Sequence, residues 1–278
     1  MSSNTPATIA FIGGGNMASA LIGGLIRAGR APGEILVIEP VDAQRKRLKA
    51  DFKVQTRAAA DAALGDAALV VWAVKPQVFG AAAAPCAAHV HGALHLSVMA
   101  GIRSQAIAQA IGVAWPQAHI VRGMPNTPAL IGRGIAGLFA TPAVSAGERL
   151  VVEQVLAPTG QTLWVAQEAD LDAVTALSGS GPAYVFYFVE AMMAAAAAMG
   201  LSSEQGRQLA LATFDGATAL AAQSDESPAV LRERVTSKGG TTYAALQSLQ
   251  ADGVQAAFIK AMVAAQQRAR ELGDEFGG

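Results

Sequence analysis

Residues 8–18, T-I-A-F-I-G-G-G-N-M-A, decide which fold to expect. A short apolar run ends at Gly13, as a buried parallel strand does, and the glycines lead into apolar residues at helical spacing. A second apolar run at residues 35–38 completes a β-α-β unit. The pattern G-x-G-x-x-A at Gly13, Gly15 and Ala18 lets a dinucleotide pyrophosphate approach the backbone at a helix N-terminus. A close-packed structural turn is the alternative, but the position between a strand and a helix favours dinucleotide binding.

Charged residues beyond the second strand bear on which dinucleotide binds. Glu39, about 20 residues past the glycine turn, is placed to accept hydrogen bonds from the adenosine ribose and to repel a 2′-phosphate, which favours NAD. Arg45, Lys46 and Arg47 begin the next predicted helix and could pair with that phosphate, which favours NADP. The same three residues are also typical of a solvated helix face. The sequence therefore leaves the choice between NAD and NADP open.

Further apolar runs predict the rest of the first domain. They lie at residues 67–74, 94–99 and 119–122, while Phe139 and residues 162–165 are expected to supply the last strands. Strands alternating with helical stretches predict an N-terminal Rossmann-type, doubly wound parallel sheet. Beyond it, segments rich in Ala, Leu and Met with almost no strand signal predict an all-α domain. The expected division is residues 1–165 and residues 166–278.

The composition limits the class of partner. The chain has 278 residues, a formal net charge of −1, 52% hydrophobic residues and 15% charged residues. This balance predicts no nucleic-acid partner and no attraction to an anionic membrane. Alanine runs at residues 81–84 and 194–198 fall short of the roughly 20 strongly apolar residues that a transmembrane helix needs. With no secretory signal visible at the start of the sequence, a cytoplasmic protein is expected.

The histidines and the cysteine give no reason to expect a metal or a thiol nucleophile. His89, His91 and His95 lie close in the sequence, but their spacing fits no familiar zinc site. They are interpreted as surface or strand-edge residues. Cys86 is the single cysteine, no motif places a histidine beside it, and it is expected to be inert.

Two segments of the helical half carry the remaining signals. Residues 184–193 are apolar on nearly all faces of a helix, which favours a subunit interface over a central core helix in a monomer. Residues 234–246 read R-V-T-S-K-G-G-T-T-Y-A-A-L, with two glycines that permit a tight turn with exposed N–H groups. Four hydroxyls and Lys238 crowd this turn. At a helix start it could seat a small carboxylate or phosphate, and a solvated loop with an N-cap is the alternative.

Taken together, these motifs resemble the pyrroline-5-carboxylate reductases along essentially the whole chain. The matching segments are F-I-G-G-G-N-M-A at residues 11–18, A-V-K-P at 73–76, M-P-N-T-P-A at 124–129, S-G-S-G-P-A-Y at 178–184 and V-T-S-K-G-G-T-T-Y-A-A-L-Q-S-L-Q at 235–250. The resemblance implies reduction of 1-pyrroline-5-carboxylate to L-proline by NADPH or NADH, the last step of proline biosynthesis. It implies a helical domain that interlocks with a second subunit, in homodimers that commonly assemble to decamers. Each active site would lie between one subunit's nucleotide domain and helical residues from both.

The resemblance also implies roles for individual residues. The cofactor would be bound by two groups of positions: Gly13, Gly14, Gly15, Asn16, Met17 and Glu39, and then Ala73, Val74, Lys75, Pro76, Ala100 and Gly101. The substrate carboxylate would be held at Gly239, Gly240 and Thr241, with Ser237 beside them. The Thr242 hydroxyl, as the catalytic group, would hydrogen-bond the ring nitrogen, and Glu168 aligns with an acid near the substrate. Two positions depart from the family pattern: Lys238 stands where proline is frequent, and Glu39 where many NADPH-preferring members have a small hydroxyl residue.

Other functions fit part of the sequence. A β-hydroxyacid dehydrogenase joins the same two kinds of domain, but its catalytic lysine has no counterpart within residues 181–190. A reductase for another cyclic imine is compatible with every motif. A regulatory protein that binds NAD(P)H without turnover is the non-enzymatic alternative, and it predicts no cofactor oxidation by pyrroline-5-carboxylate.

Overall fold

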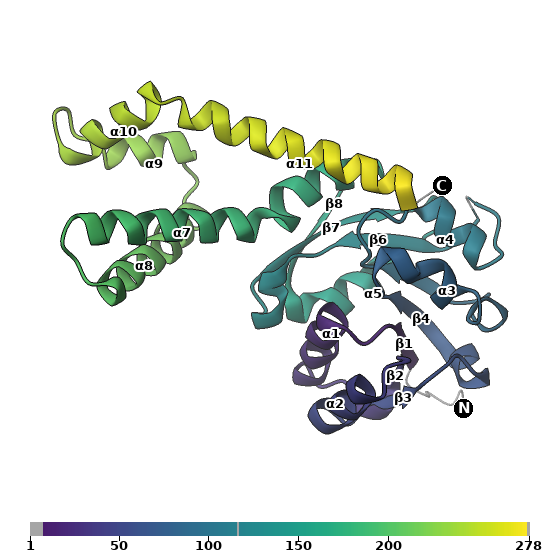
Figure 1. Ribbon diagram of the computed structural model, residues 1–278. Helices are drawn as coiled ribbons and strands as arrows, with labels where there is room; N and C mark the ends of the chain where they lie inside the picture. Colours follow the sequence, from purple (N-terminus) through teal and green to yellow (C-terminus); the bar gives the residue numbers. More distant parts are fainter. Residues whose placement is uncertain (1–7, 116, 277–278) are drawn as a thin grey trace. The chain divides into compact units, whose positions relative to one another are not determined.

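The structure, a computed structural model, describes residues 8–115 and 117–276 (Figure 1). Its contacts divide the chain into two compact units. Unit 1 comprises the described residues up to Ser180 and those from Ala265 onward, and unit 2 comprises Gly181–Ala264. The division expected after residue 165 stays a prediction about functional domains. The division by contacts falls later, after Ser180, because Leu171 is buried in unit 1 and Val174 packs on Gly137 of the sheet.

Unit 1 is built on an eight-stranded sheet with the order β3-β2-β1-β4-β5-β6-β7-β8. The strands are β1 Thr8–Ile12, β2 Ile35–Ile38, β3 Gln55–Arg57, β4 Ala67–Trp72, β5 Leu94–Ser97, β6 Ile120–Met124, β7 Gly134–Ala140 and β8 Gly160–Trp164. All neighbouring pairs are parallel except β6 and β7, which are antiparallel. The predicted Rossmann-type sheet is confirmed, with the correction that it is mostly rather than wholly parallel.

The strand order sets the position of the first site. Ile12, the last residue of β1, pairs with Ile38 of β2 on one side and with Trp72 of β4 on the other. The loops after these three strands therefore meet at one edge of the sheet, where the chain order switches direction. Crevices at such switch points are where open α/β sheets bind ligands.

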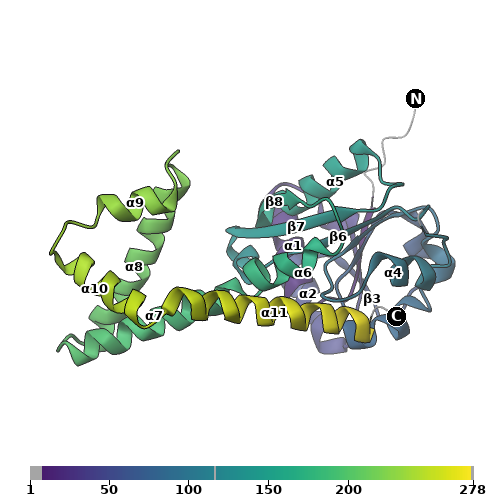
Figure 2. The ribbon, with the colours of Figure 1, turned by 90° about the horizontal axis from the view of Figure 1, so that it is seen from above.

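Helices cover both faces of the sheet (Figures 1 and 2). Side chains of α1 (Asn16–Arg27), α2 (Asp42–Phe52) and α5 (Ala146–Leu156) join one apolar cluster. Those of α3 (Phe79–Ala83) and α4 (Ser104–Ala110) join the other. Successive β1 residues alternate between the two clusters, with Phe11 in the first and Ile12 in the second, as the two-residue repeat of a strand requires.

A π-helical turn, η7 (Thr175–Gly179), follows α6 (Asp170–Val174) at the end of unit 1. The Thr175 hydroxyl donates to the Leu171 carbonyl, and a Cβ on Gly179 would lie 2.6 Å from Met124 Cε. A larger residue than glycine does not fit there without moving Met124. This π turn, which contains Ser178 and Gly179, separates α6 from the helix that starts unit 2 at Gly181. Such π turns inside helices are frequent at functional sites.

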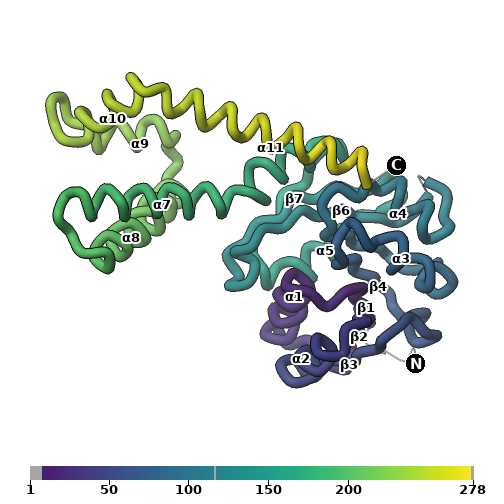
Figure 3. The backbone as a smooth tube through the Cα atoms, in the orientation of Figure 1, coloured from purple at the N-terminus to yellow at the C-terminus, as the bar shows by residue number. Residues whose placement is uncertain are grey.

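Unit 2 is helical throughout. It contains α7 (Gly181–Ala198), α8 (Ser203–Ala222), α9 (Pro228–Arg234), α10 (Thr241–Ala251) and the first part of α11 (Val254–Phe276), whose path Figure 3 traces. Gly206 of α8 packs closely on Ala196 of α7, and Ser202 starts α8 with a capping box. The predicted all-α second half is confirmed.

The apolar run of α7 is largely exposed within this chain. Phe186 and Tyr187 are 60% and 69% exposed, while Val189 and Ala196 are the buried residues of the helix. By length and composition alone, one described stretch, Asp170–Ala198, could span a membrane. That stretch includes the π turn, and a single stretch of this kind is weak evidence for a membrane span. Its exposed side chains are what a helical subunit interface requires.

Candidate dinucleotide and substrate sites

The turn between β1 and α1 has the geometry predicted for a pyrophosphate seat. Gly13 has a φ of 95°, and a Cβ there would lie 2.8 Å from the Ala73 carbonyl oxygen, so only glycine fits. A Cβ on Gly15 would meet nothing within 4 Å, and Gly15 starts α1 without a side-chain cap. The first N–H groups of α1 are therefore available to an anion.

A cavity of about 560 Å³ opens beside this turn. Of the predicted cofactor positions, those that line it are Gly13, Gly14, Gly15, Glu39, Ala73, Val74 and Lys75. The positions that do not line it are Asn16, Met17, Pro76, Ala100 and Gly101. The cavity also has an apolar wall that the sequence did not single out, formed by Val41, Ala58, Ala59, Ala60, Val78 and Ala82. Only the strand order, which places β3 next to β2, brings residues 58–60 to this edge.

Cys86 also belongs to this wall. It is buried, and burial raises the pKa of its thiol to about 11. A thiol with so high a pKa holds almost no thiolate at neutral pH, which agrees with the expectation that Cys86 is not a nucleophile.

The Glu39 side chain is fixed at the rim of the glycine turn. Its Oε2 accepts a hydrogen bond from the Gly14 N–H, and its Oε1 accepts one from the Val41 N–H, both at 2.9 Å. The Gln44 amide donates to the Gly14 carbonyl from the other side. Glu39 thus lies beside the glycine turn, and its predicted contact with the adenosine ribose stays a prediction.

Glu168 lies in unit 1, in the segment before α6. Three donors approach its carboxylate: the Ser104 N–H at 2.6 Å, the Ser104 hydroxyl at 2.8 Å and Arg122 Nη1 at 2.9 Å. Glu168 therefore ties β6 to the start of α4, which begins three residues after Gly101. Its predicted contact with the substrate stays a prediction.

The turn at residues 235–240 joins α9 to α10 in unit 2. Gly239 has a φ of 74°, and the Gly240 N–H donates to the Ser237 carbonyl at 3.0 Å. Gly240 starts α10 without a side-chain cap, which leaves the N–H groups of Thr241 and Thr242 pointing out of the helix end. Thr242 is half-buried and Lys238 is exposed. This is the geometry predicted for a carboxylate seat, and the roles of its residues stay predictions.

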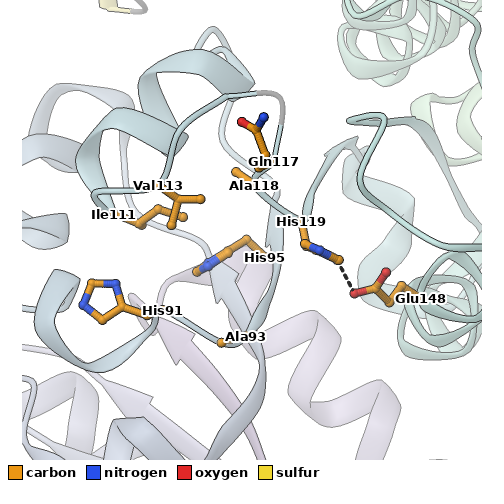
Figure 4. Close-up of a pocket in the computed structure, with 10 residues that line it drawn as sticks. His91, Ala93, His95, Ile111, Val113, Gln117, Ala118, His119 and Glu148 are labelled. Atoms are coloured by element: carbon orange, nitrogen blue, oxygen red, sulfur yellow. Dashed lines mark hydrogen bonds and ion pairs between the residues drawn. The ribbon is translucent and has the colours of Figure 1, made fainter.

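A second cavity, of about 200 Å³, lies at the opposite edge of the sheet, at the amino ends of β5 and β6 (Figure 4). His95 lines it but is buried, and its Nδ1 accepts a hydrogen bond from Trp72 Nε1 at 3.1 Å. Burial lowers the pKa of His95 to about 4. The interpretation of His95 as a surface or strand-edge residue is wrong, because β5 lies between β4 and β6 in the interior of the sheet.

Two other polar residues that line this second cavity, His119 and Glu148, pair with each other. His119 Nδ1 lies 2.7 Å from Glu148 Oε1, and Glu148 caps α5 together with Ser145. Within residues 8–115 and 117–276, no three His, Cys, Asp or Glu side chains are grouped to hold a metal ion. The carboxyl edge of the sheet is therefore the better candidate for chemistry.

Comparisons with known proteins agree with this geometry. Residues 168–272 match the family model for pyrroline-5-carboxylate reductase dimerisation, and residues 8–101 match that for NADP oxidoreductase, coenzyme F420-dependent. Pyrroline-5-carboxylate reductase of Pseudomonas aeruginosa is 42% identical over 270 residues, which are 97% of this chain and 98% of that protein. The chain belongs to the pyrroline-5-carboxylate reductase family.

Solved structures of pyrroline-5-carboxylate reductases are similar over nearly the whole chain. The enzyme from Coxiella burnetii has a TM-score of 0.89 at 35% identity and covers 96% of this chain and 98% of its own. That from Plasmodium falciparum, with NADP bound, has a TM-score of 0.85 at 26% identity with the same coverage. Family membership confirms the predicted activity, NAD(P)H-dependent reduction of the C=N bond of 1-pyrroline-5-carboxylate to give L-proline, and the presence of a dimerisation domain.

Proposed function

We propose that two glycine turns divide the work of this pyrroline-5-carboxylate reductase. The turn before α1 binds the cofactor pyrophosphate, and the turn before α10 binds the substrate carboxylate. The observation that carries the proposal is that both helices start at a glycine without a side-chain cap. Each turn therefore offers backbone N–H groups to an anion.

The proposed roles at the second turn follow from its chemistry. Thr241 and Thr242 present free N–H groups at the start of α10. Gly239, Gly240 and Ser237 shape the turn, which the bond from the Gly240 N–H to the Ser237 carbonyl closes. The Thr242 hydroxyl can then hydrogen-bond the ring nitrogen of a substrate whose carboxylate sits on these N–H groups. Bound reduced nicotinamide supplies the hydride. A protonated cyclic imine is already electrophilic, so these residues contribute mainly by holding the ring and its proton in place.

The remaining cofactor contacts are assigned along the carboxyl edge of the sheet. Asn16 and Met17 begin α1, Ala73 to Pro76 follow β4, and Ala100 and Gly101 follow β5. We place these last two groups along the central part of the cofactor and its nicotinamide. Glu168 is placed in the same region through its bonds to Ser104.

We propose a cytoplasmic homodimer that assembles further to a decamer. The exposed apolar side chains of α7 support an interface between subunits, and the low net charge and composition fit a cytoplasmic enzyme. The functional boundary is placed after residue 165, close to residue 168, where the dimerisation match begins.

The carboxylate seat is tested with substrates that differ in one group. We expect kcat/KM for 1-pyrroline, which lacks the carboxylate, to be at least about 100-fold below that for 1-pyrroline-5-carboxylate, since that group orients the imine. A six-membered cyclic imine carboxylate tests the alternative that another ring is the substrate. Equal kcat/KM for 1-pyrroline and 1-pyrroline-5-carboxylate would contradict the proposed carboxylate seat. A higher kcat/KM for the six-membered imine carboxylate would show that this ring, and not pyrroline-5-carboxylate, is the preferred substrate.

A further inference from the structure

The position and bonding of Glu39 bear on a property that the family leaves open, the choice between NADH and NADPH. Glu39 follows β2 and lines the same cavity as Gly13, Gly14 and Gly15. The residue is 9% exposed, and each carboxylate oxygen accepts one backbone N–H bond. The side chain is thus held in one orientation before any ligand binds. Since a carboxylate oxygen has two lone pairs, each can still accept a hydrogen bond from a ribose hydroxyl.

The basic residues that could counter this charge have other partners. Arg45 Nη1 donates to the carbonyls of Glu39 and Pro40 at 2.8 and 2.7 Å, and its Nη2 pairs with Asp42 at 3.0 Å. Lys46 pairs with the same aspartate at 2.8 Å. These bonds hold the Arg45 guanidinium against the backbone that follows β2.

The residues that line the cavity also disfavour a 2′-phosphate beside Glu39. Arg47 pairs with Asp51 at 3.5 Å, and none of Arg45, Lys46 and Arg47 is among the described residues that line the cavity. Near Glu39 the other lining residues are apolar, namely Ile38, Pro40, Val41 and the three alanines at residues 58–60. Lys75 is the one cation among the described lining residues, and it follows β4 rather than β2. A phosphate beside Glu39 would therefore meet a carboxylate and an apolar wall.

We infer that Glu39 makes this enzyme prefer NADH over NADPH. The carboxylate accepts hydrogen bonds from the 2′- and 3′-hydroxyls of the adenosine ribose, and it repels the 2′-phosphate, which carries about −1.5 to −2 charges at neutral pH. The Plasmodium falciparum relative was solved with NADP, and the two chains are 26% identical. The inference rests on the proposed seat of the pyrophosphate at Gly13–Gly15, because that seat places the ribose at Glu39.

The test compares both cofactors in the full-length enzyme and in variants. We expect wild-type kcat/KM to be at least about tenfold higher with NADH than with NADPH, corresponding to at least about 1.4 kcal/mol. Glu39→Gln and Glu39→Ser should each reduce that ratio at least about tenfold, mainly by improving NADPH. A folding defect would lower the rates with both cofactors equally, so the NADH/NADPH ratio reports cofactor preference and not the fraction of folded enzyme. Asp51→Asn, which removes a carboxylate from α2 outside the cavity, is the matched control and should keep the wild-type ratio.

Binding gives a readout that does not depend on turnover. The dissociation constants of NADH and NADPH, measured by quenching of protein fluorescence, should show the same preference and the same loss of it in the Glu39 variants. A wild-type preference for NADPH in binding, or a ratio that the Glu39 variants leave unmoved, would overturn the inference. So would a selective loss of NADPH binding in Arg45→Gln, because it would show that Arg45 holds the 2′-phosphate. Absence of cofactor oxidation with intact binding would count against the reaction assigned to the protein, while the binding ratio would still decide the role of Glu39.

Discussion

Thr242 is the residue on which the proposed chemistry depends most. It is the second residue of α10, so its N–H belongs to the proposed carboxylate seat. Its hydroxyl, on the same residue, is close enough to that seat to contact the bound substrate. We expect Thr242→Ala to lower kcat/KM about 10- to 100-fold, which corresponds to about 1.4–2.7 kcal/mol for one hydrogen bond to the reacting group. Steady-state kinetics with 1-pyrroline-5-carboxylate measures this.

The matched control for Thr242 is Thr218→Ala in α8. The Thr218 hydroxyl is exposed and donates to the Phe214 carbonyl of its own helix at 2.7 Å. Removing it should leave kcat/KM within about twofold of wild type, since surface changes of this kind are worth about 0.5 kcal/mol or less. If Thr242→Ala kept kcat/KM as close to wild type as Thr218→Ala does, Thr242 would have no role in the reaction.

His95 gives a pH dependence with a definite sign. Burial lowers its pKa from 6.5 to about 4, so the folded protein keeps the ring neutral while the unfolded chain takes up a proton as the pH falls below 6.5. The contribution to stability is full above pH 6.5 and is lost as the pH falls toward 4, reaching a loss of about 2 kcal/mol at pH 5. We expect the NMR signals of the His95 ring to stay constant from pH 7 to about 5.5. A titration midpoint near 6.5 would show that the ring is exposed.

At the scale of residues, the sequence was sufficient where chemistry depends on the backbone. Gly13 and Gly239 were predicted as turn glycines, and both have a positive φ. It failed for His95, because no local pattern shows which strand lies in the middle of the sheet. It could not show that Glu168 binds Ser104 either, since 64 residues separate them.

The segment from β5 to α4 shows how separate elements support one loop. Gly101 has a φ of 77°, and a Cβ there would lie 3.2 Å from the Leu272 carbonyl in the last turns of α11. Arg103 pairs with Asp274 of the same turns at 2.7 Å, and Glu168 holds Ser104 from the other direction. The loop at Ala100 and Gly101, proposed to line the nicotinamide, is therefore fixed at its C-terminal side.

Glu168→Gln distinguishes two roles for this side chain. An amide can accept from Ser104 but leaves Arg122 without a charged partner, so we expect a loss of about 1–3 kcal/mol in the free energy of unfolding. If Glu168 acts by positioning the loop, KM for the reduced cofactor rises and KM for pyrroline-5-carboxylate is unchanged. If Glu168 touches the substrate, as the resemblance implies, KM for pyrroline-5-carboxylate rises and KM for the reduced cofactor is unchanged.

Glu148→Gln is the control for that measurement. Glu148 pairs with His119 and caps α5 at the opposite edge of the sheet. The variant should also lose stability, by about 1 kcal/mol for the weakened cap, with both KM values as in wild type. A shift of cofactor KM in this variant would mean that lost stability alone explains the effect of Glu168→Gln.

Among the elements, long apolar runs were predictable and short polar ones were not. β1, β2 and β4 are continuous apolar segments and were expected close to their observed bounds. β3 has only Q-T-R, and it forms because β2 offers an open edge for pairing. The antiparallel direction of β7 was not predictable, because apolar runs carry no information about strand direction.

The exposed apolar face of α7 leads to a prediction for the whole molecule. Phe186 is 60% exposed in a helix that belongs to the dimerisation match. We expect Phe186→Glu to shift the enzyme toward the 28.3 kDa monomer, because burying the added charge at an interface costs more than the contact contributes. Sedimentation velocity measures the shift, and for wild type it also tests whether the assembly has ten subunits.

Ile131→Glu is the control for the assembly. Ile131 is 74% exposed and lies in unit 1, outside residues 168–272. This variant should sediment as wild type does. A wild-type distribution for Phe186→Glu as well would contradict an interface on α7.

The central claim is that this protein couples oxidation of a reduced nicotinamide cofactor to formation of L-proline. The most direct measurement follows cofactor absorbance with 1-pyrroline-5-carboxylate and each of NADH and NADPH, and quantifies L-proline in the same samples. We predict one L-proline formed per cofactor oxidised, with at least one of the two cofactors, and no oxidation without the imine. Cofactor binding with no oxidation by 1-pyrroline-5-carboxylate, for either cofactor, would contradict the claim.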